Sequence, residues 1–85
     1  MAYELVFTDT SKRQIKKLDT PIKKRIQIKL LEALSVPDVS KVGIQLSGEW
    51  HPYRRLRIGT YRVIFNISGN KFVVHRVQHR KDVYR

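Results

Sequence analysis

The last third of the chain alternates between apolar residues and arginine, tyrosine or other polar residues, a period of two that is typical of half-buried β-strands. Three runs show the pattern, at residues 53–58, 61–67 and 71–78. Gly59-Thr60 and Ser68-Gly69-Asn70 separate them and supply the glycine and asparagine that tight hairpin turns require. The stretch therefore predicts three consecutive antiparallel strands. The apolar positions give the predicted core of these strands: Leu56, Ile58, Val63, Phe65, Ile67, Val73 and Val77.

The first half predicts one strand and two helices. Residues 2–8 alternate as a strand, and Asp9-Thr10-Ser11 offers N-cap candidates for a short helix that ends near Leu18. Thr20-Pro21 predicts a second helix start, with Thr20 as the cap. Apolar residues then recur at helical spacing to about Ser35. Residues 39–48 show no periodic pattern and predict a connecting loop.

These elements predict a single α+β domain over residues 1–85, in the order β-α-α-β-β-β. We expect the N-terminal helical hairpin to pack on one face of an antiparallel sheet. Arg55, Arg57 and Arg62 have the parity opposite to the apolar residues, so they should line the other, open face.

Charge is the second strong constraint. Residues 51–85 contain nine Lys or Arg and one acid, and so carry eight of the eleven net positive charges of the chain. Arginines dominate this set, and their planar guanidinium groups suit bidentate contacts with phosphate. A solubilising role alone would be met by mixed Lys and Glu. The pattern therefore favours RNA or DNA as the target.

Several other classes of protein are disfavoured. The chain has no cysteine, the three histidines lack the spacing of zinc ligands, and no glycine-rich nucleotide motif occurs, so we expect neither a metal nor another cofactor. No apolar run approaches the length of a membrane span, and the N-terminus does not read as a signal peptide. We expect a cytoplasmic protein that does not bind membranes.

Candidate acid–base residues lie near the C-terminus. His79 is followed by Arg80, and neighbouring positive charges disfavour a protonated histidine, which leaves a neutral imidazole able to accept a proton. Tyr84 offers a hydroxyl or a stacking ring. We expect His75 to be structural, His51 to be part of a loop and Trp50 to cover the core. A nuclease with these groups could cut RNA without a metal, because the 2′-OH supplies the nucleophile.

Two segments carry a resemblance to a known family. Residues 53–65, which read Y-R-R-L-R-I-G-T-Y-R-V-I-F, and residues 74–85, which read V-H-R-V-Q-H-R-K-D-V-Y-R, resemble the RelE family within the RelE/ParE superfamily of bacterial toxin–antitoxin toxins. The opening strand and the helical hairpin are also similar. The resemblance implies a ribosome-dependent endoribonuclease (mRNA interferase), which cuts mRNA in the ribosomal A site by 2′-OH attack and so inhibits translation.

The same resemblance implies roles for individual residues. Arg62 would grip the scissile phosphate, Arg55 and Arg57 would neutralise the pentavalent state, and Arg80 would act likewise. His79 or Tyr84 would be the general base or acid. Some members carry lysines, which serve as the base, where this chain has Tyr53 and Arg55. Arginine is too basic to accept a proton near neutral pH, so the role of the base shifts to His79 or Tyr84. The residues implied to bind substrate are Tyr53, Arg54, Arg57 and Lys81.

The resemblance also implies partners and an alternative function. The partners would be the ribosome, mRNA and a RelB-like helical antitoxin that wraps the toxin in a hetero-oligomer. The alternative is a ParE-like toxin, which shares the fold, binds DNA gyrase and is not a nuclease. In that case the arginines would serve recognition, and His79 and Tyr84 would be dispensable.

Overall fold

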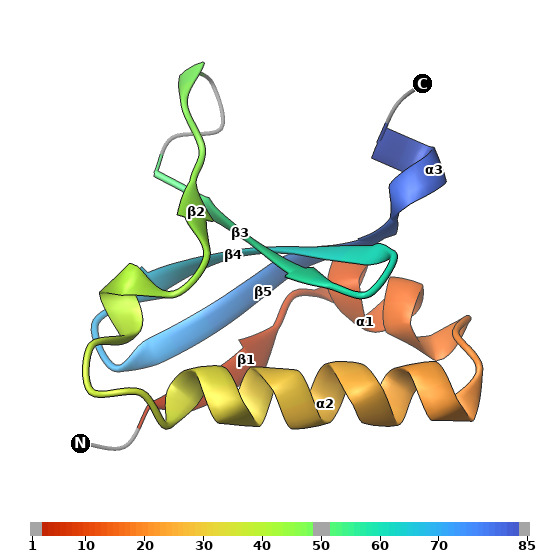
Figure 1. Cartoon of the computed structure of the whole chain (residues 1–85), viewed down its shortest axis with the longest axis horizontal. Coiled ribbons are helices and arrows are strands. Elements are labelled where there is room, and N and C mark those ends of the chain that lie inside the picture. Colours follow the sequence, from red (N-terminus) through yellow and green to blue (C-terminus); the bar gives the residue numbers. More distant parts are fainter. Residues whose placement is uncertain (1–2, 49–51, 84–85) are drawn as a thin grey trace.

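The computed structural model of the chain describes residues 3–48 and 52–83, so the expectations for Trp50, His51 and Tyr84 fall outside it. Figure 1 shows the elements in sequence colours. Their order is β1 (Glu4–Phe7), α1 (Asp9–Lys16), α2 (Thr20–Leu34), the 3-10 helix η1 (Val39–Lys41), β2 (Ile44–Gln45), β3 (Arg54–Ile58), β4 (Tyr61–Ser68), β5 (Lys71–His79) and α3 (Arg80–Val83).

The strands form one mixed sheet in the order β1-β5-β4-β3-β2. The three C-terminal strands are antiparallel hairpins, as predicted. The α+β class is therefore confirmed, with two differences. Strand β1 runs parallel to β5, because the helical hairpin follows β1 and the chain enters the sheet again from its far edge. Strand β2 pairs with β3 inside the segment that was expected to be a loop.

Both predicted helices form, but each is capped one residue earlier than expected. Thr8 is the N-cap of α1, and its Oγ1 accepts a hydrogen bond from the backbone N–H of Ser11 at 3.2 Å. Asp19 is the N-cap of α2, with Pro21 in the first turn where its missing N–H costs no hydrogen bond. The first helix is held on β5 by Gln14, whose Oε1 accepts from the backbone N–H of Val77 at 2.6 Å.

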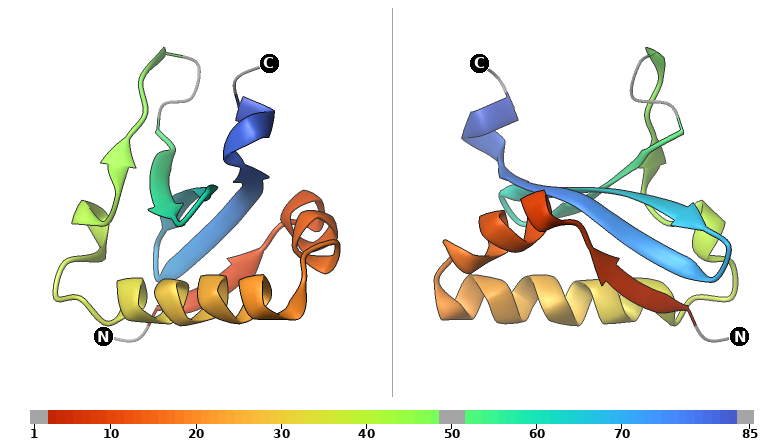
Figure 2. Two further views of the ribbon diagram at one scale, coloured as in Figure 1. Left: turned by 45° about the vertical axis from the view of Figure 1, so that its right-hand side comes forward. Right: turned by 180° about the vertical axis from the view of Figure 1, so that it is seen from behind.

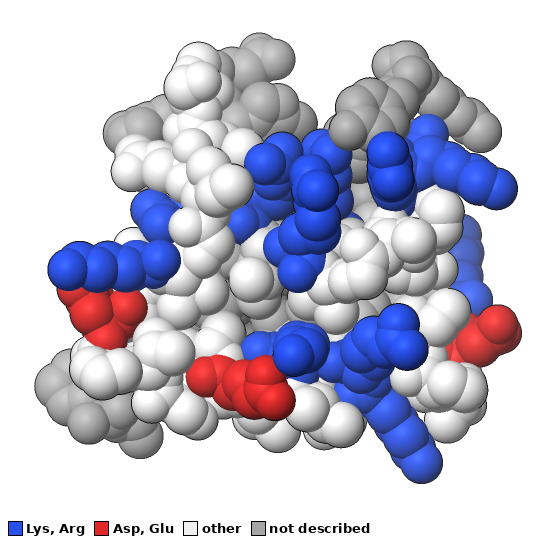
Figure 3. Space-filling view, viewed as in Figure 1, with Lys and Arg blue, Asp and Glu red and all other residues white. Residues whose placement is uncertain are grey.

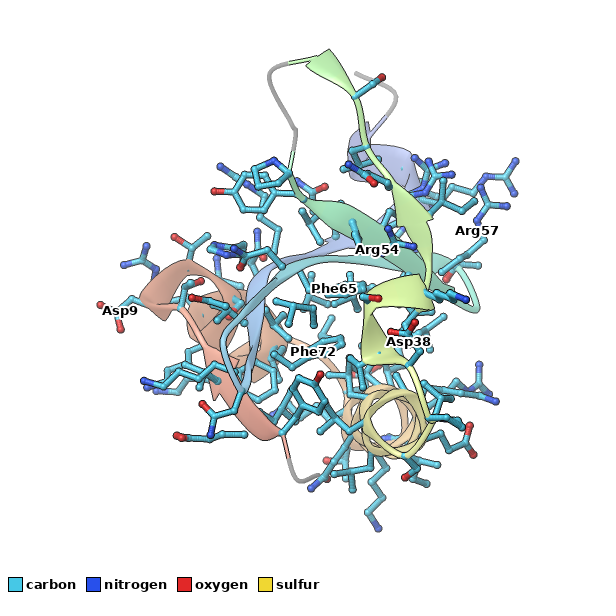
Figure 4. All side chains as sticks on the ribbon, turned by 90° about the vertical axis from the view of Figure 1, so that its left-hand side faces the viewer. Asp9, Asp38, Arg54, Arg57, Phe65 and Phe72 are labelled. Carbon is cyan, nitrogen blue, oxygen red and sulfur yellow. The ribbon has the colours of Figure 1, made fainter. Side chains whose placement is uncertain are left out.

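The two long helices cover one face of the sheet and leave the other face open (Figures 1 and 2). The core lies between these layers. Phe65 and Phe72 stack at its centre with ring centroids 4.2 Å apart, below the sheet in Figure 4. Leu30 of α2 is also fully buried there. Of the predicted core residues, Ile58, Val63, Phe65 and Val77 are buried, and Leu56 and Ile67 are half-buried against them.

The prediction that Val73 belongs to the core was wrong, because β5 contains a bulge. Ile64 pairs with Arg76 and Phe65 pairs with Val74, so His75 has no partner on β4. An extra residue in one strand shifts the side-chain alternation beyond it. Val74 and Val77 both reach the core, although they lie three residues apart, while Val73 lies opposite Asn66. Among the described helices, none is long and apolar enough to span a membrane.

Candidate nucleic-acid interface

The open face of the sheet lies between two raised elements. The outer ends of β2 and β3 stand on one side of it, and α3 stands on the other (Figures 1 and 2). Figure 3 shows Lys and Arg side chains over the upper part of this view and more of them lower down on the helices, whereas the acidic side chains lie only in the lower part. In this view the helices therefore carry charges of both signs, and the upper part shows cations without acidic neighbours.

A small depression at the α3 end of this face is lined by three of the predicted arginines. Its volume is about 50 Å³, and its walls are formed by Arg57, Gly59, Thr60, Tyr61, Arg62 and Arg80. We call these residues the arginine depression. The β3–β4 hairpin supplies five of them and the start of α3 supplies the sixth. Cationic groups from separate elements thus converge on one concave spot.

Sheet register forces two of these charges together. Arg57 and Arg62 are directly opposite each other on β3 and β4, and like charges in that arrangement destabilise a sheet. Arg57 projects outward from β3 in Figure 4. Arg62 lies on the same face but is only 8% exposed, so its charge sits at the floor of the depression. An anion bound between them would relieve the repulsion.

The third arginine is fixed by the backbone. The N–H of Arg80 donates to the carbonyl oxygen of Thr60 at 2.6 Å, which ties the first residue of α3 to the hairpin turn. Gly59 in that turn has a φ of 60°, a conformation that glycine adopts without strain. The turn residues Gly59, Thr60 and Tyr61 were not predicted as part of the site, although their position directly before Arg62 in sequence was a usable signal.

His79 lies beside this depression in a defined orientation. Its ring meets the ring of Tyr61, its cross-strand neighbour, edge to face with centroids 5.0 Å apart. Its Nδ1 accepts a hydrogen bond from the backbone N–H of Lys81 at 3.1 Å. A nitrogen that accepts cannot also carry a proton, so the neutral ring holds its proton on Nε2. In this arrangement Nε2 is a donor.

The other predicted residues are spread more widely. Arg55 lies on the open face but outside the arginine depression, and Lys81 is exposed on α3. Arg54 faces the opposite way and is bound to the chain itself: its Nε donates to the carbonyl of Val42 at 2.7 Å and its Nη2 to that of Gly43 at 2.9 Å. Arg54 therefore holds the segment before β2.

Tyr53 is part of a second polar group on the open face. Its ring meets that of His75 at an interplanar angle of 72°, with centroids 4.8 Å apart. Burial, together with the charge of Arg76, lowers the pKa of His75 below its usual value. Across the described residues, no three His, Cys, Asp or Glu side chains are grouped so as to hold a metal ion.

With the geometry established, comparison with known proteins gives a family. The sequence model of the ParE toxin of the ParDE type II toxin–antitoxin system matches residues 5–84. The chain belongs to the RelE/ParE superfamily of type II toxins. Toxin RelE3 of Methanocaldococcus jannaschii is 29% identical over 83 residues, which cover 95% of this chain and 94% of that protein.

Solved structures of RelE proteins have the same fold. The RelB–RelE antitoxin–toxin complex from Methanococcus jannaschii contains a chain that is 29% identical, with a TM-score of 0.70, over 93% of this chain and 94% of that one. The RelBE2 toxin–antitoxin complex from Mycobacterium tuberculosis also contains a chain that is 29% identical, with a TM-score of 0.70. The match covers 94% of this chain and 100% of that one. The isolated E. coli RelE toxin, at 21% identity, has a TM-score of 0.74, and the match covers 92% of this chain and 84% of that one. These likenesses confirm the RelE-like fold that the sequence motifs predicted.

Proposed function

We propose that this toxin is an endoribonuclease that cuts mRNA in the ribosomal A site and so stops translation. The observation that carries the proposal is the arginine depression, where Arg57, Arg62 and Arg80 converge on a space of about 50 Å³. Such a space suits a phosphate group. The similarity to Toxin RelE3 over nearly the whole chain supports an activity of the RelE type over the gyrase-binding alternative.

In the proposed reaction, the 2′-OH of one nucleotide attacks the adjacent phosphate. The bond from phosphorus to the 5′-oxygen breaks, which leaves a 2′,3′-cyclic phosphate and a 5′-OH. The 2′-OH loses a proton and the departing 5′-oxygen gains one. Negative charge accumulates on the phosphate oxygens in the transition state, so Arg62 at the floor and Arg57 at the wall stabilise it electrostatically.

Arg80 and His79 act on the leaving-group side. Arg80 completes the ring of cations, and the Nε2–H of His79 donates a hydrogen bond that stabilises the departing oxygen, which takes its proton from water or from Tyr84. Tyr84 remains our proposed alternative for acid or base. The 2′-OH proton passes to Tyr84 or to water, and both are weak bases, so most of the rate depends on a ribosome that holds the RNA in line for attack. The reaction needs no metal because the arginines supply the charge.

Flanking residues bind the rest of the strand. We assign Arg55 and Lys81 to neighbouring phosphates and Tyr53 to a base. Arg54 contributes indirectly, since its guanidinium group holds the carbonyls of Val42 and Gly43 and so fixes the wall beside the open face.

A cognate antitoxin is the proposed protein partner. The similar structures from Methanococcus jannaschii and Mycobacterium tuberculosis are toxin–antitoxin complexes. An acidic, helical, RelB-like antitoxin would wrap this chain, neutralise its net charge of +11 and cover the open face in a hetero-oligomer. The toxin would act in the cytoplasm, where it meets ribosomes.

The test is to add the purified toxin to ribosomes programmed with a defined mRNA and to map new 5′ ends. We expect cuts within the A-site codon, 5′-OH products, and little cutting of the same RNA without ribosomes. Gyrase supercoiling is assayed in parallel. Intact mRNA together with inhibited supercoiling would contradict the proposal and favour the ParE-like alternative.

A further inference from the structure

A second hollow lies on the same open face, beside the middle of β5. Its volume is about 220 Å³, and its lining residues are Thr8, Thr10, Tyr53, Ile64, His75 and Arg76. It is formed where the β1–α1 junction, the start of β3 and the bulge of β5 meet. The mechanism above leaves His75, Thr8 and Thr10 without a role.

The bulge in β5 builds this hollow. Because His75 is the extra residue, its side chain reaches the open face beside Asn66, and its Nε2 lies 2.6 Å from Asn66 Oδ1. Its carbonyl oxygen accepts a hydrogen bond from Thr8 Oγ1 at 3.1 Å, which anchors the bulge to the start of α1. Asn66 therefore fixes the ring of His75, and Thr8 fixes the backbone that carries it.

These contacts fix the protonation of the ring. Asn66 Oδ1 can only accept, so Nε2 carries the proton. The pKa of His75 is lowered by burial and by Arg76, so the ring is neutral near pH 7 and Nδ1 is an acceptor. In the described part of the chain Nδ1 has no hydrogen-bond partner, and no buried side-chain nitrogen or oxygen is left unsatisfied there. Nδ1 is then exposed, on a ring that lines the hollow.

Two aromatic rings form a corner in this hollow. Tyr53 and His75 meet at 72°, so a planar group that stacks on one ring presents its edge to the other. Aromatic faces and a hydrogen-bond acceptor, with hydroxyl groups nearby, are what proteins use to hold unstacked nucleobases. The volume admits one base.

The position of the hollow links it to the arginine depression. Ile64 in its floor and Arg62 in the depression are two residues apart on β4 and face the same side. Two residues of a strand span about 7 Å, a step comparable with the distance between adjacent nucleotides in an extended strand. Arg76 and Arg55 add positive charge around the path between them.

We propose that the hollow is a subsite for one nucleobase of the RNA, that of a nucleotide next to the bond that is cut. The base stacks in the corner made by Tyr53 and His75, and one of its N–H groups donates to His75 Nδ1. The subsite would give the toxin a base preference at one position of the codon. This inference rests on the proposed function, because it places the RNA through the cleaved phosphate.

The experiment combines a change in the protein with a change in the substrate. Ribosomes in excess are programmed with mRNA that lacks the base at a single A-site position, tested one position at a time. Single-turnover cleavage rates are compared for the wild type, Tyr53→Leu, His75→Phe and the control Val73→Thr, which lies on the open face outside the hollow. Effects of the missing base on the ribosome are common to all four proteins and cancel in the comparison.

We expect the missing base at one position to slow the wild type and the control by about 5- to 100-fold, the range for loss of one base–aromatic stack. The same substrate should slow Tyr53→Leu far less, because the contact is already absent. His75→Phe keeps a ring but loses the acceptor, so it should still stack the base while its preference among the four bases flattens.

Equal losses in the wild type and in both variants, at every position, would overturn the subsite. This result differs from failure of the proposed function, in which the wild type would not cut ribosome-bound mRNA at all. If Tyr53→Leu does not fold, the base preference of His75→Phe decides: a profile identical to that of the wild type would overturn the inference.

Discussion

At the scale of single residues, the open face is shaped by its positive charges. Arg57 and Arg62 stand opposite each other, and Arg62 is 8% exposed. Placing a cation at the floor of a depression costs desolvation free energy. Arginine suits this position because it stays charged and offers several donors in one plane. A phosphate group bound in the depression would offset part of this cost during the reaction.

Replacing Arg62 tests this role. Arg62→Ala should slow single-turnover cleavage by roughly 10²–10³-fold, the loss that follows removal of one transition-state donor. Arg62→Lys keeps the charge but not the planar guanidinium group, so its cleavage rate should lie between the rates of the wild type and of Arg62→Ala. Thermal unfolding of both variants serves as the control for folding. Full activity in Arg62→Ala would remove this residue from the site.

The lowered pKa of His75 predicts a pH dependence of stability. The folded chain binds a proton at His75 less readily than the unfolded chain does, so the unfolded state gains protons first as the pH falls below the ordinary value of 6.5. The contribution of His75 to the free energy of unfolding is complete above that pH and is lost below it. Denaturant unfolding between about pH 8 and about pH 5 should show the loss, and His75→Gln should reduce it. An identical pH profile in this variant would contradict the assignment.

At the scale of elements, β2 shows how a short strand depends on one glycine. Gly43 has a φ of 72°, and a Cβ at this position would collide with the carbonyl oxygen of Arg55 on β3. Arg54 clamps the same place through the carbonyls of Val42 and Gly43. The strand consists of Ile44–Gln45 alone, so its pairing depends on this close approach.

Gly48 provides a matched control for this claim. Its φ is 67°, and in the described part of the chain nothing lies within 4 Å of the position that a Cβ would take, so alanine there brings backbone strain without a collision. Gly43→Ala should therefore lower the free energy of unfolding more than Gly48→Ala, which should cost about 1 kcal/mol. The two variants are compared by chemical denaturation. Equal losses would show that the approach of β2 to β3 is not tight.

The elements also show what the sequence could and could not predict. Local alternation and the turns at Gly59 and Gly69 were enough to predict the hairpins. The hairpins in turn predicted that Arg55, Arg57 and Arg62 lie on one face. The bulge at His75 was not predictable from a period of two, because an extra residue looks like any other position. The direction of β1 and the pairing of β2 depend on contacts distant in sequence. The burial of Arg62 and the inward turn of Arg54 depend on neighbours from other elements.

At the scale of the whole molecule, the fold separates two tasks. The helices and the core provide stability on one face of the sheet, and the other face carries the arginine depression and the hollow around His75. Strand β4 contributes Arg62 to one site and Ile64 to the other, so their separation is fixed by sheet geometry. A rigid arrangement of this kind suits an enzyme that relies on positioning more than on a strong base.

The central claim is that cleavage depends on the positions of the arginines on the open face, and not on the total positive charge of the protein. The measurement is the single-turnover rate of mRNA cleavage on programmed ribosomes in excess, for two variants with equal loss of charge. One is Arg62→Ala with Arg80→Ala, in the arginine depression, and the other is Lys16→Ala with Lys24→Ala, exposed on α1 and α2. We predict a loss of at least about 10²-fold for the arginine pair and a rate close to that of the wild type for the lysine pair. Equal rates for the two variants would contradict the account.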